Sequence, residues 1–227
     1  MNTDDQKRAA GEAGASLAQV GMVVGLGTGS TAAYFVRALA ARKLDVRCVA
    51  TSVATETLAR SLGLATIDLN DAPPIDLTVD GADEIGPGLA LIKGAGAALL
   101  REKLVWEASR RCVVIADARK TVATLGDFIL PVEVVAFGHK TTARRIRGVL
   151  EACEIAAAPA LRMKDGAPLA TDSGNLIYDL ACGAIPDPAG LAEALKRVTG
   201  VVEHGLFLGL AQLALIGTED GVAKLTP

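Results

Sequence analysis

The first half of the chain alternates short apolar segments with segments rich in helix-forming residues, and this alternation constrains the fold more than any other feature. Short apolar runs bounded by turn residues are typical of buried strands. Strands that alternate with helices form a parallel sheet with helices on its faces. We therefore predict an α/β fold with a doubly wound, mostly parallel, Rossmann-like sheet. Its expected strands are residues 22–24, 46–50, 65–69, 75–79 and 111–116, and its expected helices include 4–19, 54–62 and 95–110.

After residue 127 the pattern changes to the order strand, helix, strand, strand, helix, strand. This order is typical of a ferredoxin-like α+β domain. We therefore predict a Rossmann-like domain of residues 1–127 and 204–227, with a smaller ferredoxin-like domain of residues 128–203 inserted towards the C-terminus. The apolar segment 206–216 is predicted to return the chain to the larger domain. In the smaller domain the expected strands are 128–135, 156–162, 175–180 and one near Val201, and the expected helices are 140–152 and 188–198.

Charge and hydrophobicity exclude several classes of protein. The 227 residues carry a net charge of −3, whereas nucleic acids and anionic membranes select a basic surface, so we expect neither as a partner. The N-terminal residues contain no apolar signal-peptide core, and no apolar stretch is long enough to cross a bilayer. The four cysteines are widely spaced and are predicted to be small buried hydrophobic residues in a soluble, cytoplasmic protein.

A charged, glycine-rich stretch in the middle of the chain is the strongest candidate for a functional site. The predicted strand 75–79 ends at Asp80, and Asp83 follows three residues later. In an open α/β sheet, ligands bind in the crevice at the carboxyl ends of the strands. A second apolar run ends at the start of a helix, where backbone N–H groups can approach an anion. The residues at that point are Lys93, Gly94, Ala95 and Gly96.

Glu102 is the candidate for a catalytic base. At about 100° per residue, a helix over 95–110 places Lys103 and Glu107 on a polar arc, whereas Glu102 falls among apolar residues such as Trp106. Burial in an apolar setting raises the pKa of a carboxylate and makes it a useful proton acceptor near neutral pH. The alternative interpretation is a helix glutamate that forms a pair on the surface.

A second glycine-rich loop, Gly25–Thr31, follows the predicted first strand and precedes an alanine-rich helix that ends near Arg42. A strand, a glycine loop and a helix N-terminus together form an anion-binding site. Nicotinamide binding is not expected, because Ser30 occupies a glycine position of the dinucleotide pattern and the next strand ends in Thr51 and Ser52 instead of an acidic residue. No Gly-Lys-Ser/Thr follows, which excludes a Walker A motif. A tight turn between strand and helix is the alternative interpretation.

Carboxylates and lysines are the side chains available for chemistry. His139 and His204 are far apart in sequence and match neither a metal site nor a Ser-His-Asp triad. Lys120 follows the strand end at Asp117 and is either a phosphate contact or a solvated loop lysine. Carboxylates beside an anion-binding loop favour proton transfer on a small sugar phosphate, in which a lysine or N–H groups stabilise an enediolate oxygen. We expect neither a cofactor nor a metal.

Four motifs closely resemble ribose-5-phosphate isomerase, type A: GLGTGSTA at 25–32, DGADEI at 80–85, KGAGAALLREK at 93–103 and DARK at 117–120. The shorter stretches LPVEV at 130–134, DSGN at 172–175 and LIGTEDG at 215–221 fit the same family, so the resemblance covers nearly the whole chain. The chain departs from the family at Ala95, where Lys-Gly-Gly-Gly is frequent. An added methyl group there would tighten the loop slightly.

The resemblance implies interconversion of D-ribose 5-phosphate and D-ribulose 5-phosphate in the pentose phosphate pathway, through an enediolate and without a cofactor. It also implies a homodimer or a homotetramer. Glu102 is expected to be the base, in a catalytic site with Asp80, Asp83 and Lys93. The residues expected to bind the sugar phosphate are Thr28, Gly29, Ser30, Thr31, Asp80, Gly81, Ala82, Asp83, Lys93, Gly94, Ala95, Gly96, Lys120 and Lys7.

Two other functions are compatible with a fold of this kind. A non-catalytic sugar-phosphate sensor is the first, but no helix-turn-helix or basic region precedes the predicted sheet, and a pure binder has no use for Glu102 as a base. A sugar-phosphate deaminase is the second, and release of ammonia from an amino sugar phosphate would identify it.

Overall fold

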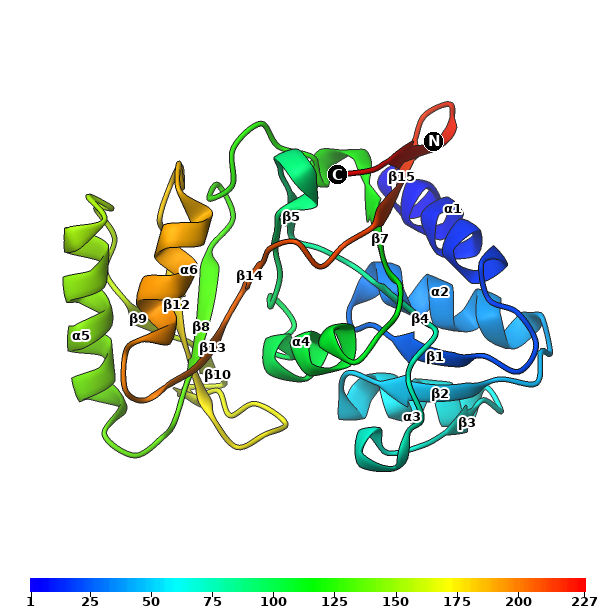
Figure 1. Ribbon diagram of the computed structural model, residues 1–227, viewed down its shortest axis with the longest axis horizontal. Coiled ribbons are helices and arrows are strands. Elements are labelled where there is room, and N and C mark those ends of the chain that lie inside the picture. The colour runs from blue at the N-terminus through cyan, green and yellow to red at the C-terminus, as the bar shows by residue number, and fades with distance from the viewer. The chain divides into compact units, whose positions relative to one another are not determined.

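The computed structural model describes residues 1–227, and contacts divide the chain into two compact units, whose elements are labelled in Figure 1. The first unit contains Met1–Ala82, Arg101–Thr121 and Gly209–Pro227, and the second contains Asp83–Leu100 and Val122–Leu208. These units differ from the predicted domains, in which residues 83–100, 122–127 and 204–208 belong to the larger domain.

The first unit is built on a seven-stranded sheet in the order β16-β15-β7-β4-β1-β2-β3. All neighbouring pairs are parallel except β15 with β16. β1, β4 and β7 are buried along their whole length, as expected for strands covered on both faces. The predicted mostly parallel sheet is therefore confirmed. The strands are β1 (Val23–Leu26), β2 (Arg47–Ala50), β3 (Ala65–Thr66), β4 (Leu77–Asp80), β7 (Cys112–Asp117), β15 (Leu213–Thr218) and β16 (Gly221–Leu225).

Helices cover both faces of this sheet. The larger apolar core joins strand residues such as Val24 to helix residues such as Phe35. Val23 points to the opposite face, because successive strand residues alternate, and it packs with Val105 of α4 (Leu99–Glu107). The doubly wound arrangement is therefore also confirmed. The helices that pack on the larger core are α1 (Thr3–Ser16), α2 (Ser30–Ala41) and α3 (Val53–Ser61).

The second unit contains a four-stranded antiparallel sheet in the order β13-β8-β12-β9. Alternate residues of β8, such as Val132, form a core with Ile146 of α5 and Leu195 of α6, which lie side by side in Figure 1. This topology confirms the predicted ferredoxin-like α+β arrangement. Its elements are β8 (Leu130–Val134), α5 (His139–Ala152), β9 (Ala160–Leu161), β12 (Leu176–Leu180), α6 (Pro188–Lys196) and β13 (Val201–His204).

A three-stranded sheet in the second unit explains why residues 83–100 belong there. It joins β5 (Glu84–Ile85), β6 (Leu91–Ile92) and β14 (Leu206–Phe207), in the order β14-β6-β5. These two-residue strands are too short for a periodic pattern, so the sequence did not predict this sheet. β14 also lies within the segment that was predicted to return directly to the larger domain.

α4 is shorter than the predicted helix 95–110, and one of its residues is buried against expectation. Ala97 has a φ of 60°, a left-handed conformation, and the helix begins only at Leu99. Lys103, predicted on the polar arc, is buried, whereas its neighbour Leu104 is exposed. The polarity of a helical arc does not show which side other segments cover, and the prediction for Lys103 was therefore wrong.

Two further predictions need correction, and three strands were missed. Strand β3 has only two residues, because Leu69–Asp71 forms a 3-10 helix capped by the side chain of Asp68. Cys48 and Cys112 are buried, but Cys153 is exposed and Cys182 is intermediate. The hairpin of β10 (Met163–Lys164) and β11 (Ala167–Pro168) and the strand β16 were not predicted.

Candidate active site

In the first unit, the carboxylate of Asp80 is tied to the glycine loop that follows β1. The Thr28 N–H donates to Asp80 Oδ1 at 3.0 Å, and the Gly81 N–H donates to the same oxygen at 2.7 Å. A Cβ atom at Gly27 would lie 2.1 Å from Asp80 Oδ1, so only glycine allows this approach. β1 and β4 are neighbours in the sheet. The glycine loop and Asp80, which are both candidates for ligand binding, therefore lie at the carboxyl ends of adjacent strands.

A cluster of hydroxyl groups forms hydrogen bonds with the same loop. Thr28 Oγ1 lies 2.7 Å from Thr51 Oγ1 and 2.8 Å from Ser52 Oγ. The Thr55 hydroxyl donates to the Gly27 carbonyl at 3.0 Å. Thr51, Ser52 and Thr55 are buried. This supporting role was not predicted from the sequence, although the hydroxyl residues at the end of β2 were the available signal.

The N-terminus of α2 is the candidate for an anion site in the first unit. Gly29 and Ser30 are exposed there, and no side chain caps the helix. The Lys7 ammonium donates to Ser30 Oγ at 3.2 Å. Uncapped N–H groups, the helix dipole and a lysine together favour a phosphate. The Gln6 side chain accepts from the Ala118 N–H at 3.3 Å, which brings α1 to the turn that carries Lys120.

Glu102 lies on α4 in the first unit and is only 4% exposed. Neighbouring residues of the same helix, Val105 and Trp106, are also buried. A buried carboxylate on an apolar helix face is a group that can hold and release a proton without competition from bulk water.

In the second unit, Lys93 follows β6 and is 2% exposed. Its ammonium lies 5.4 Å from the centre of the Phe207 ring, which is within the range of a cation–π interaction. The Lys93 N–H donates to the Gly205 carbonyl at 2.9 Å. A Cβ atom at Gly205 would lie 2.3 Å from the Lys93 carbonyl oxygen, so this close approach needs glycine.

The loop after Lys93 is held by Asp83. The Ala95 N–H donates to Asp83 Oδ2 at 2.9 Å. Gly94 has a φ of 112°, and a Cβ atom there would lie 2.9 Å from Pro131, so glycine is required at that position. Ala95 does not have a positive φ and is exposed, so its methyl group is accommodated without strain.

The predicted site residues are distributed over both units. Hydrogen bonds join Lys7 to Ser30, and Asp80 to Thr28 and Gly81, in the first unit. The first unit also contains Gly29, Thr31, Ala82, Glu102 and Lys120, and the second contains Asp83, Lys93, Gly94, Ala95 and Gly96.

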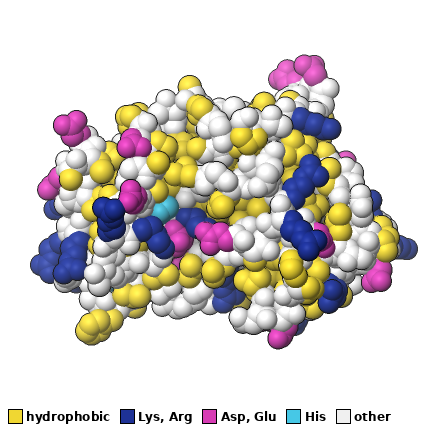
Figure 2. Space-filling view, viewed as in Figure 1, with side chains coloured by type: hydrophobic (Ala, Val, Ile, Leu, Met, Phe, Trp, Pro, Cys, Tyr) yellow, Lys and Arg dark blue, Asp and Glu magenta, His cyan; other side chains and the backbone are white.

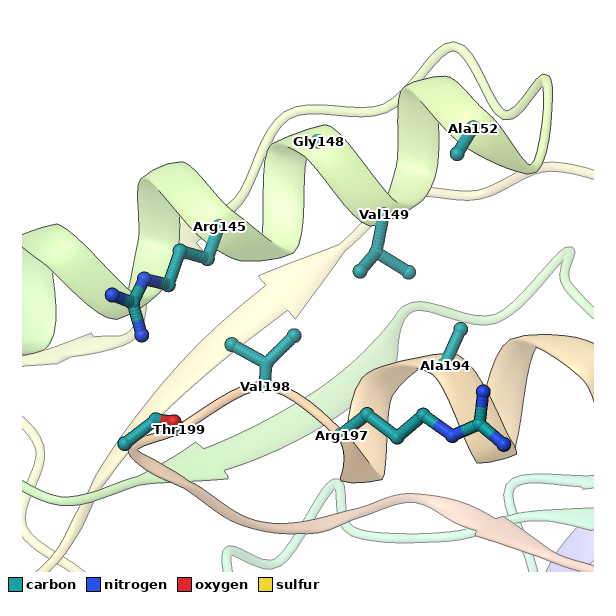
Figure 3. Close-up of a pocket in the computed structure, with 8 residues that line it drawn as sticks. All are labelled: Arg145, Gly148, Val149, Ala152, Ala194, Arg197, Val198 and Thr199. Carbon is teal, nitrogen blue, oxygen red and sulfur yellow. The ribbon is translucent and has the colours of Figure 1, made fainter.

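A surface groove of about 420 Å³ between α5 and α6 contains none of the predicted residues. Figure 3 shows that its two arginines, Arg145 and Arg197, extend away from each other, so they do not converge on one ligand. Dark blue side chains gather at the left edge of Figure 2, over α5, whose basic residues are Lys140, Arg144, Arg145 and Arg147.

No group of three or more His, Cys, Asp or Glu residues has an arrangement that could hold a metal ion. None of the helices combines the length and the hydrophobicity needed to cross a lipid bilayer.

The strand order and the position of the loops define the class of the protein. A sheet in which β1 lies between β2 and β4 has its switch point between β1 and β4, where Rossmann-like α/β proteins bind small ligands. Gly27, Thr28 and Asp80 lie at this point.

Comparisons with known proteins agree with this class. The family model of ribose 5-phosphate isomerase A (phosphoriboisomerase A) matches residues 47–221. The ribose-5-phosphate isomerase A of Caulobacter sp. strain K31 is 65% identical over 227 residues, which is 100% of each chain. The chain belongs to the ribose 5-phosphate isomerase A family and is an isomerase. The resemblance predicted from the sequence motifs is confirmed.

Solved structures show the same fold along the whole chain. Ribose 5-phosphate isomerase from Plasmodium falciparum has a TM-score of 0.91 at 36% identity, with 99% of each chain covered. A D-ribose-5-phosphate isomerase in complex with phospho-erythronic acid has a TM-score of 0.93 at 35% identity, with 100% of each chain covered.

Proposed function

We propose that this chain interconverts D-ribose 5-phosphate and D-ribulose 5-phosphate in the pentose phosphate pathway, with Glu102 as the base. In the open-chain aldose, the Glu102 carboxylate takes the proton from C2, and the electrons of the C1=O bond move to O1 as the enediolate forms. The proton then returns to C1, the hydroxyl proton of O2 passes to O1, and a C2=O bond remains. The single observation that carries this proposal is the burial of Glu102 in a member of this family.

The substrate phosphate is held in the first unit in this proposal. The exposed N-terminus of α2, the hydroxyl groups of Ser30 and Thr31, and the Lys7 ammonium supply the donors, and Lys120 adds a positive charge. The complex of a solved relative with phospho-erythronic acid supports a phosphorylated ligand. Binding energy from the phosphate is remote from C1 and C2, so it can orient the reacting carbons.

Charge that develops on O1 is stabilised by Lys93 and by the N–H groups of Gly94 and Gly96, since the Ala95 N–H donates to Asp83. Asp80 and Asp83 bind the sugar in this proposal, and one of the two assists opening of the ring. These roles require no cofactor and no metal, so turnover should survive exhaustive treatment with EDTA. Activity that EDTA abolishes and a divalent cation restores would refute this part of the proposal.

Substitution of Glu102 tests the proposal directly. Glu102→Gln keeps the shape of the side chain but cannot accept the proton, so turnover should fall by about 10² to 10⁴ while substrate affinity changes little. Glu102→Asp should be intermediate, because the carboxylate is displaced by about 1 Å. The matched control is Glu107→Gln, because Glu107 is exposed on the same helix. This variant should keep full activity. Strong turnover in Glu102→Gln would refute the role of Glu102 as the base.

Isotope transfer gives an independent test of the proton transfer. Isomerisation in deuterated water should place deuterium at C1 of ribulose 5-phosphate, at least in part, if the Glu102 carboxyl group exchanges with solvent before it returns the proton. NMR of the product measures this incorporation. Binding of ribose 5-phosphate without ketose formation would instead favour a sensor.

We further propose that the protein acts in the cytoplasm as a homodimer or homotetramer. Free cysteines support a reducing compartment. Phe137, which is 95% exposed, supports self-association because an interface would bury it. Light scattering coupled to size-exclusion chromatography should give a mass of two or four chains, and a monomer at micromolar concentration would contradict the proposal.

A further inference from the structure

Arg162 and Asp179 form an ion pair in the second unit. Arg162 Nε donates to Asp179 Oδ2 at 2.9 Å, and Nη2 donates to Oδ1 at 2.5 Å. The two side chains are 14% and 20% exposed. The backbone of Arg162 is anchored as well, since its N–H donates to the Ile177 carbonyl of β12 at 2.8 Å. Two parallel contacts to one carboxylate fix the plane of the guanidinium.

The same guanidinium holds the loop that follows Lys93. Arg162 Nη1 donates to the Gly94 carbonyl at 2.9 Å and to the Ala95 carbonyl at 3.2 Å. These are two consecutive carbonyl groups of the loop whose Gly94 and Gly96 N–H groups are assigned to the substrate in the proposed function. Asp179 therefore sets the position of Arg162, and Arg162 sets the position of two peptide groups.

Peptide geometry turns these contacts into a means of orienting N–H groups. In a planar trans peptide the C=O of one residue and the N–H of the next point in opposite directions. The Gly94 carbonyl points to Arg162, and the Ala95 N–H on the other side of that peptide donates to Asp83 Oδ2 at 2.9 Å. The Ala95 carbonyl likewise points to Arg162, which directs the Gly96 N–H away from Arg162.

We propose that Arg162, fixed by Asp179, is a positioning residue for the isomerase reaction. It orients the Gly94–Gly96 loop so that Asp83, the loop N–H groups and Lys93 are correctly placed for the substrate. This inference rests on the proposed function, and Arg162 lies outside the sequence motifs that resemble the family. Arg162 need not touch the substrate.

Arginine is the side chain that this arrangement requires. Its planar fork can donate to a carboxylate on one side and to two carbonyl groups on another, whereas a lysine ammonium is a compact charge that cannot span these partners together. Arg162→Lys should therefore keep a positive charge but lose loop orientation. Arg162→Met keeps much of the side-chain length and removes every side-chain donor.

The experiment measures kcat, KM and thermal stability of Arg162→Lys, Arg162→Met and Asp179→Asn. We expect kcat per folded molecule to fall about 10-fold or more, which corresponds to about 1.4 kcal/mol in the barrier, with KM changed less than about threefold because the phosphate is held elsewhere. Arg197→Met is the matched control, because Arg197 also pairs with a carboxylate, that of Glu193, on the exposed surface of the same unit. It should keep the kcat of the unmodified protein.

Two outcomes of these measurements would overturn the inference. One is a folded Arg162→Lys variant with unchanged kcat. The other is a loss of kcat that disappears when rates are divided by the folded fraction, which would show a purely structural ion pair.

A double-mutant cycle adds a measurement that does not depend on the stability of the variants. If Arg162 acts through the Lys93 loop, Arg162→Lys combined with Lys93→Ala should lose less activity than the product of the two single losses. Additive losses would also overturn the inference.

If Glu102→Gln is inactive while the Arg162 variants are fully active, this inference fails and the proposed function stands. If Glu102→Gln is active, the proposed function itself fails.

Discussion

The Thr28 N–H donates to Asp80 Oδ1 at 3.0 Å, and this bond joins the ends of two adjacent parallel strands. It fixes the orientation of a buried carboxylate by means of a backbone group, which cannot rotate away as a side chain could. The approach depends on the absence of a Cβ atom at Gly27, which would lie 2.1 Å from the same oxygen. Position 27 is therefore a sensitive test of this geometry.

Gly27→Ala should displace Asp80 and reduce both stability and turnover. The added methyl group meets the backbone and the carboxylate of Asp80, so an overpacking cost of about 1–3 kcal/mol is expected. Gly148→Ala is the matched control, because a Cβ atom there meets nothing within 4 Å and Gly148 lies inside α5. That change should stabilise the protein by about 0.5–1 kcal/mol without affecting turnover. Urea unfolding and an isomerase assay measure both effects, and equal behaviour of the two variants would contradict this account.

Lys93→Ala should cost about 2–4 kcal/mol of transition-state stabilisation, as loss of an oxyanion donor does. The physical reason is that Lys93 is a buried cation beside the loop assigned to the enediolate. Steady-state kcat/KM gives this quantity. Lys196→Ala is the control, since Lys196 pairs with Glu203 in the same unit but has no assigned role in the reaction. Unchanged turnover and affinity in Lys93→Ala would show that Lys93 serves only the fold.

The loop after Lys93 should tolerate glycine at position 95 but not alanine at position 94. Gly94→Ala places a Cβ atom 2.9 Å from Pro131 on a residue with a φ of 112°, so we expect a loss of about 1–3 kcal/mol and displacement of Lys93. Ala95→Gly removes an exposed methyl group and should cost at most about 1 kcal/mol, with activity retained. Thermal unfolding and kcat distinguish the two, and similar losses in both variants would refute the assignment of strain to Gly94.

Stability should decrease at alkaline pH because of two buried thiols. Burial raises the pKa of Cys48 to about 12 and that of Cys112 to about 12, from an ordinary value of 9.0. The folded state therefore keeps protons that the unfolded state releases. The stabilisation is complete below pH 9.0 and declines as the pH rises towards about 12, by about 1.4 kcal/mol per pH unit for each thiol.

Unfolding in urea under reducing conditions at pH 8 to 10.5 measures this decline. Cys48→Ala should show a shallower decrease above pH 9 than the unmodified protein, whereas Cys153→Ala, which removes an exposed thiol, should leave the slope unchanged. Identical slopes in all three proteins would argue against ionisation of Cys48 as a cause.

Local patterns in the sequence were sufficient for most of the fold and for the family. Strand 75–79 and the run 111–116 have the composition of buried parallel strands, and they became β4 and β7 with shifts of one or two residues. Asp80 was placed at a strand end because an apolar run stops there. The long motifs around Asp80 and Lys93 identified the family, which the comparisons then confirmed.

Tertiary structure alone decided which distant residues support the candidate site. β6 pairs with β14 across more than 100 residues of sequence, and Arg162 reaches the carbonyl groups of Gly94 and Ala95 from another part of the chain. Lys103 looked like a surface residue on the helical pattern and is buried. The physical reason is the same in each case. Periodicity and motifs report the interactions of a residue with its neighbours in sequence, whereas burial and hydrogen-bond partners depend on segments that only the folded chain brings together.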